Sequence, residues 1–207
     1  MEQALRYLLP TYLLVFFGFV FAWRTWRVWR TTGVNAYLIW TKTGVEGFVG
    51  RCFRVMPAMS ALVVVAYAWS PNSMRAFGEI PWLVSPPVQW IGLTLMISSF
   101  GFIVLAQAQM GRAWRIGIDD SARTQLVTDG LFSASRNPVF LGVMLNTFGF
   151  LLVLPNAVTL LVLGLNAALI SVQIRLEESH LETSLGEIYR DYATTTRRWW
   201  GRRRIPS

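Results

Sequence analysis

Charged residues are scarce in this sequence. Of its 207 residues only 14% are charged and 54% are hydrophobic, whereas soluble domains carry roughly a quarter charged residues. This scarcity excludes an ordinary soluble globular protein, and the 14% share of aromatic residues excludes a disordered chain. The charge that is present is unbalanced, with a formal net charge of +8. Apolar segments joined by basic loops are typical of proteins embedded in a bilayer.

Cysteine and histidine are nearly absent. The chain has one of each, Cys52 and His180. A single cysteine permits neither an internal disulfide nor a cysteine-based metal site, and we expect no bound metal. His180 lies in a highly charged stretch, where a solvated side chain is a better interpretation than a general base.

A helix needs about 20 mostly apolar residues to cross a bilayer, and five stretches of this sequence qualify. They cover residues 8–23, 53–69, 88–110, 139–154 and 157–174. Because backbone polar groups must be paired within lipid, the sequence predicts an all-α integral membrane protein with five transmembrane helices. Pro155 and Asn156 form the whole link between the last two stretches, which makes these antiparallel neighbours.

The basic residues predict the orientation. If the N-terminus lies outside and the chain crosses five times, 17 of the 19 lysines and arginines fall on the inner side, and only Arg6 and Arg75 fall outside. The positive-inside rule therefore predicts an N-out, C-in topology with the long loops and the tail on the cytoplasmic side. The tail at 197–204 combines arginines with two tryptophans, which predicts an interfacial anchor. No nucleic-acid recognition fold accompanies it, so no nucleic-acid partner is expected.

Polar residues that a membrane protein does not need for solubility mark the place of its chemistry. Eight of the eleven acidic residues follow the third apolar stretch, all on the predicted cytoplasmic side: Asp119, Asp120, Asp129, Glu177, Glu178, Glu182, Glu187 and Asp191. Arg136 and Asn137 precede Pro138, which suits the first turn of a helix whose free amides favour an anionic group. We therefore expect a polar site built from this loop and the segment after residue 174. On residue types alone, a solvated helix face held by salt bridges explains the same charges.

Two motifs flank the last pair of apolar stretches. The first precedes and enters the fourth stretch and reads Leu126-Val127-x-x-Gly130-x-Phe132-x-x-x-Arg136-Asn137-Pro138-x-Phe140-x-Gly142. The second follows the fifth stretch and reads Arg175-x-Glu177-Glu178-x-x-Leu181-x-x-x-x-Gly186-x-x-Tyr189-x-x-Tyr192. In this order and at this separation, the motifs resemble those of the membrane methyltransferases typified by isoprenylcysteine carboxyl methyltransferase and phospholipid N-methyltransferases.

The resemblance implies a function and a division of the chain. It implies methyl transfer from S-adenosyl-L-methionine to a lipid or lipophilic small molecule at the cytoplasmic boundary of the membrane, without a Rossmann domain. Residues 1–110 would supply three transmembrane helices and a cytoplasmic connector. Residues 111–207 would form the methyltransferase core, in which the loop and a C-terminal helix make the cofactor site. Such a compact chain is expected in a bacterial inner membrane, with its site facing the cytoplasm.

The same resemblance implies roles for individual residues. Arg136 and Arg175 would position the cofactor carboxylate or the substrate. The cofactor-binding positions would be Thr124, Gln125, Leu126, Val127, Gly130, Phe132, Asn137, Pro138, Phe140, Glu177 and Glu178. Trp114 and Arg115 enter the same loop and are weaker candidates.

Two departures from the carboxyl methyltransferases leave the substrate open. Asn137 and Phe140 stand where those enzymes usually show His and Tyr, and an asparagine there looks more like the phospholipid methyltransferases. The leading prediction is an isoprenylcysteine carboxyl methyltransferase-like enzyme, with phospholipid amines and small lipophilic thiols as alternative acceptors. An NADPH-dependent membrane reductase and a non-catalytic membrane scaffold are further alternatives.

Overall fold

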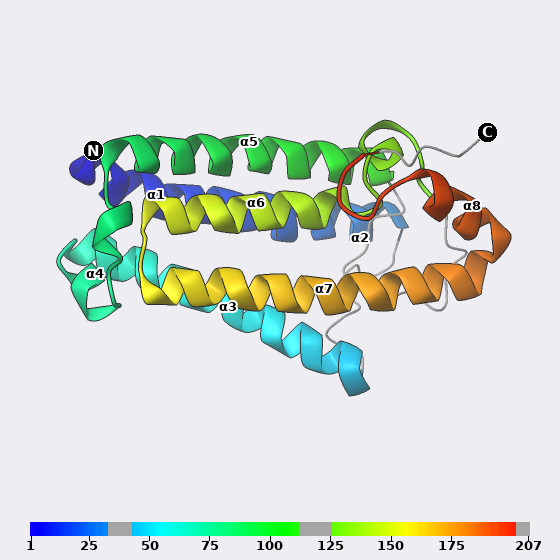
Figure 1. The fold of residues 1–207 in the computed structure, drawn as a ribbon, viewed down its shortest axis with the longest axis horizontal. Helices are drawn as coiled ribbons and strands as arrows, with labels where there is room; N and C mark the ends of the chain where they lie inside the picture. The colour runs from blue at the N-terminus through cyan, green and yellow to red at the C-terminus, as the bar shows by residue number, and fades with distance from the viewer. Residues whose placement is uncertain (33–42, 112–125, 202–207) are drawn as a thin grey trace.

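The computed structural model describes residues 1–32, 43–111 and 126–201. Within these ranges the chain forms helices joined by short turns and contains no β-strand. Most of the long helices run side by side along one axis, with the N-terminus at one end and the C-terminal segment at the other (Figure 1). The predicted all-α class is confirmed.

The first helical run is longer than the predicted stretch 8–23. It comprises three consecutive elements: α1 (Glu2–Phe17), the π-helical η1 (Gly18–Trp23) and α2 (Arg24–Thr32). Pro10 lies inside α1 rather than at its entrance. The helix begins early because Leu5 and Leu9 are fully buried in a cluster with residues of the next long helix, and that burial stabilises the first turns.

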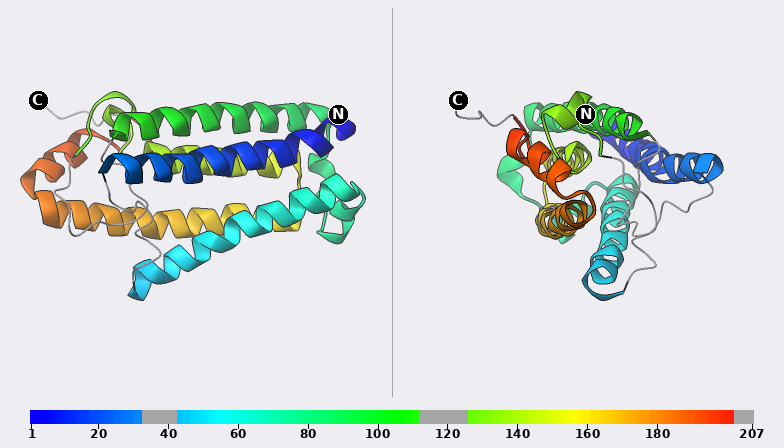
Figure 2. Two further views of the ribbon diagram at one scale, coloured as in Figure 1. Left: turned by 180° about the vertical axis from the view of Figure 1, so that it is seen from behind. Right: turned by 90° about the vertical axis from the view of Figure 1, so that its right-hand side faces the viewer.

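The middle of the chain forms two long helices and two short ones. They are α3 (Gly44–Trp69), α4 (Ser73–Ala76), the 3₁₀ turn η3 (Pro81–Leu83) and α5 (Pro86–Met110). α3 ends where predicted but begins at residue 44 instead of 53. It crosses the bundle obliquely (Figure 2), and it packs against both α7 and α1.

The C-terminal part consists of the predicted hairpin and its extensions. Its elements are the 3₁₀ turn η5 (Gly130–Ser133), α6 (Pro138–Val153), α7 (Ala157–Leu185) and α8 (Glu187–Thr195). Asn156 caps α7, since its side-chain oxygen accepts hydrogen bonds from the N–H groups of Val158 and Thr159, each at 3.0 Å. The antiparallel hairpin is confirmed (Figure 1). α7 runs to residue 185 instead of 174, so the acidic motif lies on the same helix as the fifth apolar stretch.

Within the described ranges, four helices are long and apolar enough to cross a membrane. They are Glu2–Arg27, Gly44–Trp69, Pro86–Met110 and Ala157–Leu185. α6 has 16 residues and is therefore about 24 Å long, shorter than the roughly 30 Å hydrocarbon core. The integral membrane class follows from these helices, whereas the fifth crossing and the N-out, C-in orientation remain predictions.

Glycines allow α5 and α6 to approach each other closely. A Cβ atom at Gly92 would lie 2.7 Å from the carbonyl oxygen of Gly149, and one at Gly149 would lie 2.8 Å from that of Gly92. Gly101, also on α5, has open space at its Cβ position. Small residues at a contact are how membrane helices bring their backbones together.

We predict that Gly92→Ala destabilises the protein by about 1–3 kcal/mol, the usual cost of overpacking. Gly101→Ala is the matched control on the same helix, and it should be neutral or slightly stabilising because alanine has the higher helix propensity. Thermal unfolding of the purified variants in detergent measures both. Equal midpoints for the two variants would show that the close contact between α5 and α6 is wrong.

Candidate active site

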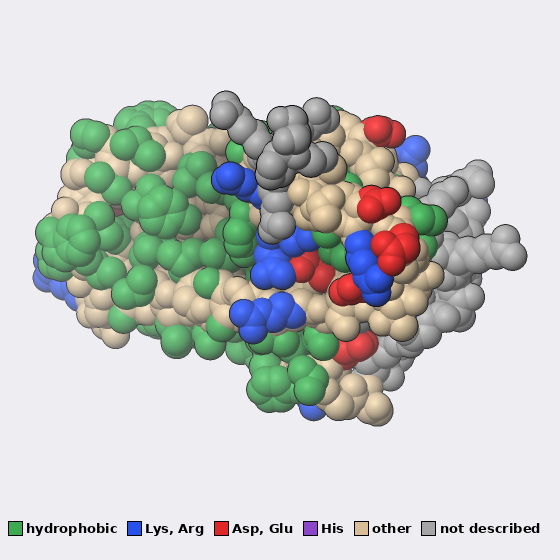
Figure 3. All heavy atoms as spheres, turned by 45° about the vertical axis from the view of Figure 1, so that its right-hand side comes forward, with side chains coloured by type: hydrophobic (Ala, Val, Ile, Leu, Met, Phe, Trp, Pro, Cys, Tyr) green, Lys and Arg blue, Asp and Glu red, His purple; other side chains and the backbone are tan. Residues whose placement is uncertain are grey.

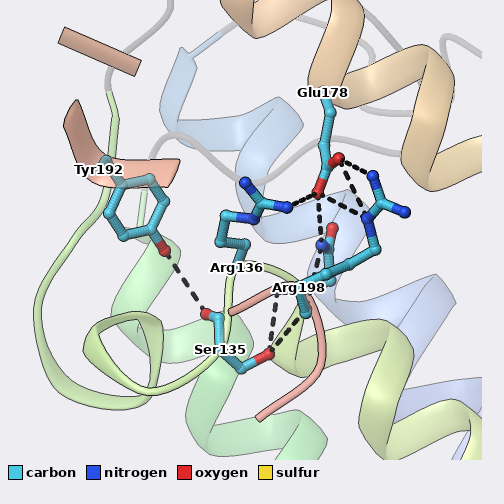
Figure 4. A network of polar contacts seen from close by, with 6 residues as sticks. Ser135, Arg136, Glu178, Tyr192 and Arg198 are labelled. Atoms are coloured by element: carbon cyan, nitrogen blue, oxygen red, sulfur yellow. Dashed lines mark hydrogen bonds and ion pairs between the residues drawn. The ribbon is translucent and has the colours of Figure 1, made fainter. Parts of the chain in front are cut away.

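A cluster of charged side chains surrounds Glu178, near the end of α7. Nη2 of Arg136 lies 3.1 Å from Oε1 of Glu178, and Nη2 of Arg198 lies 2.5 Å from Oε2. The side-chain amide of Asn137 donates to Oε1 at 3.4 Å. Figure 4 shows these groups converging on the carboxylate, and we call Arg136, Asn137, Glu178 and Arg198 the Glu178 cluster. Two guanidinium groups on one carboxylate leave an excess positive charge, which favours an anionic ligand group.

The backbone of the C-terminal tail holds the cluster together. The N–H of Arg136 donates to the carbonyl oxygen of Arg197 at 3.0 Å, and the N–H of Gly201 donates to that of Ala134 at 2.6 Å. The prediction that the tail is an interfacial anchor is therefore incomplete, because Arg198 forms an ion pair with Glu178 inside the protein. A carboxylate that is only 13% exposed requires a cationic partner. Hydrogen bonds to Glu178 also raise the pKa of the Arg198 guanidinium, which stays charged.

Two tyrosines of α8 pack behind the cluster. The hydroxyl of Tyr192 donates to the carbonyl oxygen of Phe132 at 2.6 Å and so ties α8 to the loop before α6. The buried hydroxyl of Tyr189 has no hydrogen-bond partner among the described residues. Burial raises the pKa of Tyr189 to about 12 and raises that of Tyr192 further, so both hydroxyls stay protonated near neutral pH. Tyr189 therefore offers a free hydrogen-bond donor.

A polar pocket of about 560 Å³ opens beside the cluster, between the end of α7, α8 and the tail. Figure 3 shows charged side chains of both signs gathered at this end of the molecule, whereas hydrophobic side chains cover the flank. The pocket is lined by Arg136, Arg175, Glu178, Ser179, Glu182, Tyr189, Arg190, Ala193, Thr194 and Arg198. It combines cations, carboxylates and a free hydroxyl, as a zwitterionic ligand requires.

A second cavity of about 410 Å³ lies among the long helices and is mostly apolar. Aromatic and aliphatic side chains of α1, η1, α3, α5, α6 and α7 form its walls, and Arg136, Asn137, Gln173 and Glu177 lie at one end. Arg136 lines both cavities. The Glu178 cluster therefore forms the partition between a polar pocket and an apolar cavity.

The two neighbouring glutamates have different environments. Successive helical residues point about 100° apart, so Glu178 joins the cluster while Glu177 lines the apolar cavity. Oε1 of Glu177 accepts a hydrogen bond from Nε2 of Gln173 at 2.8 Å. In the described part of the chain Glu177 forms no ion pair, whereas Glu178 has two arginine partners.

The structure brings most of the predicted site residues together. Phe132, Arg136, Asn137, Pro138, Phe140 and Glu177 line the apolar cavity, and Arg136, Arg175 and Glu178 line the polar pocket. Leu126, Val127 and Gly130 line neither of these two cavities. At Gly130 a Cβ atom would lie 2.6 Å from the Gln109 side chain, which is a packing constraint. The positions Trp114, Arg115, Thr124 and Gln125 lie outside the described residues.

Sequence reasoning missed three residues of the site. Arg198 was hidden in a basic tail that membrane binding already explained. Gln173 lies within an apolar stretch and carries no charge. Tyr189 belongs to the second motif, and this membership was the one sequence signal that could have identified it.

We predict that Glu178→Gln destabilises the protein by about 1–3 kcal/mol. The change leaves two guanidinium groups facing each other, and the cost falls below that of a fully buried pair because Arg198 is 41% exposed. Glu187→Gln is the control, since it removes only the exposed ion pair with Arg190 and should leave the unfolding midpoint unchanged. Chemical or thermal unfolding compares the two, and an unaffected Glu178→Gln variant would contradict the cluster.

Part of the chain that carries this site matches a known protein family. Residues 88–188 match the family model described as phospholipid methyltransferase. The matched segment contains the first motif, the helical hairpin and both glutamates, and it ends as α8 begins. No curated protein matches the chain. The resemblance to membrane methyltransferases expected from the two motifs is thus confirmed for residues 88–188, which are similar to the phospholipid methyltransferase family.

Proposed function

We propose that the protein transfers a methyl group from S-adenosyl-L-methionine to an amine on a lipid-like amphiphile. The observation that carries the proposal is Glu177, a carboxylate without a cationic partner in the described chain at the polar end of an apolar cavity. A negative group at that position attracts an ammonium head and repels a carboxylate. The family of residues 88–188 supports methyl transfer at a membrane.

The polar pocket fits the cofactor. S-adenosyl-L-methionine carries a carboxylate, an ammonium group and ribose hydroxyls, and the pocket offers partners for each. Arg136, Arg175 and Arg198 suit the carboxylate, and Glu178 with Glu182 suits the ammonium or hydroxyl groups. Two buried polar atoms, Nε of Arg136 and the hydroxyl of Tyr189, have no hydrogen-bond partner in the described chain, and a ligand that reached them would supply one.

The protein's task in such a reaction is alignment. When bound, the cofactor supplies a methyl group already activated by its sulfonium, so the site needs orientation and exclusion of water more than a nucleophile. Arg136 lies between the pocket and the cavity and would set the angle at which donor and acceptor meet. An ammonium acceptor must first lose a proton, and Glu177 lies where it would accept that proton. With the cofactor bound, the deprotonated amine would form the new N–C bond while the S–C bond of the methyl donor would break, with its electron pair going to sulfur.

A carboxylate acceptor, as in the carboxyl methyltransferases, is the second candidate. It is favoured by Arg136, whose guanidinium also lines the apolar cavity. An amine acceptor brings a positive head group to this end of the cavity and a carboxylate acceptor brings a negative one. A methyl-transfer assay with both kinds of acceptor separates the two candidates.

We predict that the purified protein binds S-adenosylhomocysteine and that Tyr189→Phe weakens this binding roughly threefold to tenfold, the range for one lost hydrogen bond. Unfolding of the ligand-free protein should be unaffected, because the removed hydroxyl has no partner in the described chain. For Tyr192→Phe we expect a lower unfolding midpoint instead, because this change removes the 2.6 Å hydrogen bond to the carbonyl oxygen of Phe132. Calorimetric titration and thermal unfolding of both variants provide the test. Unchanged affinity in Tyr189→Phe would remove this tyrosine from the cofactor site.

We also predict labelled-methyl transfer to amine-bearing lipids in preference to lipophilic carboxylates and thiols. Glu177→Gln should reduce transfer at least a hundredfold, the lower bound for a lost general base, while S-adenosylhomocysteine affinity changes less than threefold. Glu187→Gln is the control and should transfer normally. Labelled carboxylate esters as the main product would favour the second candidate, and NADPH binding without S-adenosylhomocysteine binding would favour a reductase.

A further inference from the structure

Five helices each place a polar side chain at about the same level of the bundle. Two groups result. Tyr12 of α1, Ser99 of α5 and Asn146 of α6 meet in one, and Thr147 of α6 and Asn166 of α7 meet in the other. Ser60 of α3 lines the apolar cavity beside them. We call these six residues the polar belt, and all of them lie near the middle of their apolar stretches, where polar groups are costly.

The side-chain N–H groups of the two asparagines in the belt donate hydrogen bonds to other helices. Nδ2 of Asn146 donates to the carbonyl oxygen of Met96 at 3.2 Å and to Oγ of Ser99 at 3.3 Å, and it contacts the hydroxyl of Tyr12. Nδ2 of Asn166 donates to Oγ1 of Thr147 at 3.1 Å. These bonds are the interhelical contacts that hold membrane helices together.

The side-chain oxygens of Asn146 and Asn166 form no such interhelical hydrogen bonds with the described residues. Neither Oδ1 atom accepts a hydrogen bond from any described residue, and neither is among the fully enclosed atoms. Asn146 and Asn166 both line the apolar cavity. Two amide oxygens therefore face a cavity inside the bundle with their acceptor capacity open, which interhelical bonding alone does not require.

We propose that this belt recognises a hydrogen-bond donor, a hydroxyl or an amide N–H, within the apolar chain of the amphiphile that occupies the cavity. The inference rests on the proposed function, in which the head of that amphiphile lies near Glu177. Asn146 follows Asn137 by nine residues and Asn166 precedes Glu177 by eleven, which corresponds to about 13 and 16 Å along the helices. An extended chain advances about 1.2 Å per bond, so the donor belongs about eleven to thirteen bonds from the head.

The test compares chains that differ only in one hydroxyl. The probes are octadecanoic acid, 12-hydroxyoctadecanoic acid and 2-hydroxyoctadecanoic acid, together with the three corresponding amines. Each is titrated against tritiated octadecylamine bound to the purified full-length protein. For either head, the 12-hydroxy chain should bind about threefold to tenfold more tightly than the plain chain. The 2-hydroxy chain should show no such preference.

Leucine variants connect the preference to the belt. Asn166→Leu should abolish the advantage of the 12-hydroxy chain and improve binding of the plain chain, because it removes one open amide oxygen and a single bond to Thr147. Asn146→Leu should do the same. Ser171→Leu is the control on the same helix, since Ser171 is exposed and bonds only to its own helix, and it should preserve the preference.

Equal binding of the hydroxylated and plain chains to the unmodified protein, or no binding of either, would overturn the proposal. A preference that survives in both asparagine variants would overturn it as well. S-adenosylhomocysteine binding is measured on the same preparations. Its presence without a chain preference rejects the belt alone, whereas its absence rejects the proposed function.

Discussion

The pairing of Glu178 with Arg136 and Arg198 is the interaction on which the site depends. It joins three segments that are distant in sequence, namely the loop before α6, the end of α7 and the tail. A carboxylate that is only 13% exposed is costly without cationic partners. The two arginines together carry more positive charge than one carboxylate neutralises. The cluster therefore closes the end of the helix bundle and leaves it attractive to an anionic group.

Helix geometry gives the site its two sides. Glu177 and Glu178 follow each other in sequence, yet one lines the apolar cavity and the other joins the ion pairs. This separation requires α7 to continue past the apolar stretch to Leu185. α7 thereby carries Glu178, with its two arginine partners, toward the polar pocket. It carries Glu177, which forms no ion pair with the described residues, toward the apolar cavity.

The sequence predicted the local features and missed the long-range ones. The helix start at Pro138 and the hairpin at Asn156 were predictable, because proline and asparagine act on their immediate neighbours. The involvement of Arg136 and Glu178 followed from the motifs. The role of Arg198 was not predictable, since its ion pair spans 20 residues and its tail had a sufficient explanation in membrane binding. The start of α3 at Gly44 escaped prediction because tertiary packing extends helices beyond their apolar cores.

Hydrogen exchange with and without S-adenosylhomocysteine tests the central claim most directly, namely that the cofactor binds where the loop, α7 and the tail meet. The account predicts slower exchange in the segments 131–137 and 187–198 on addition of the ligand. Residues 157–170, in the first half of α7, should exchange as before. Protection confined to other segments, with these two unchanged, would contradict the account.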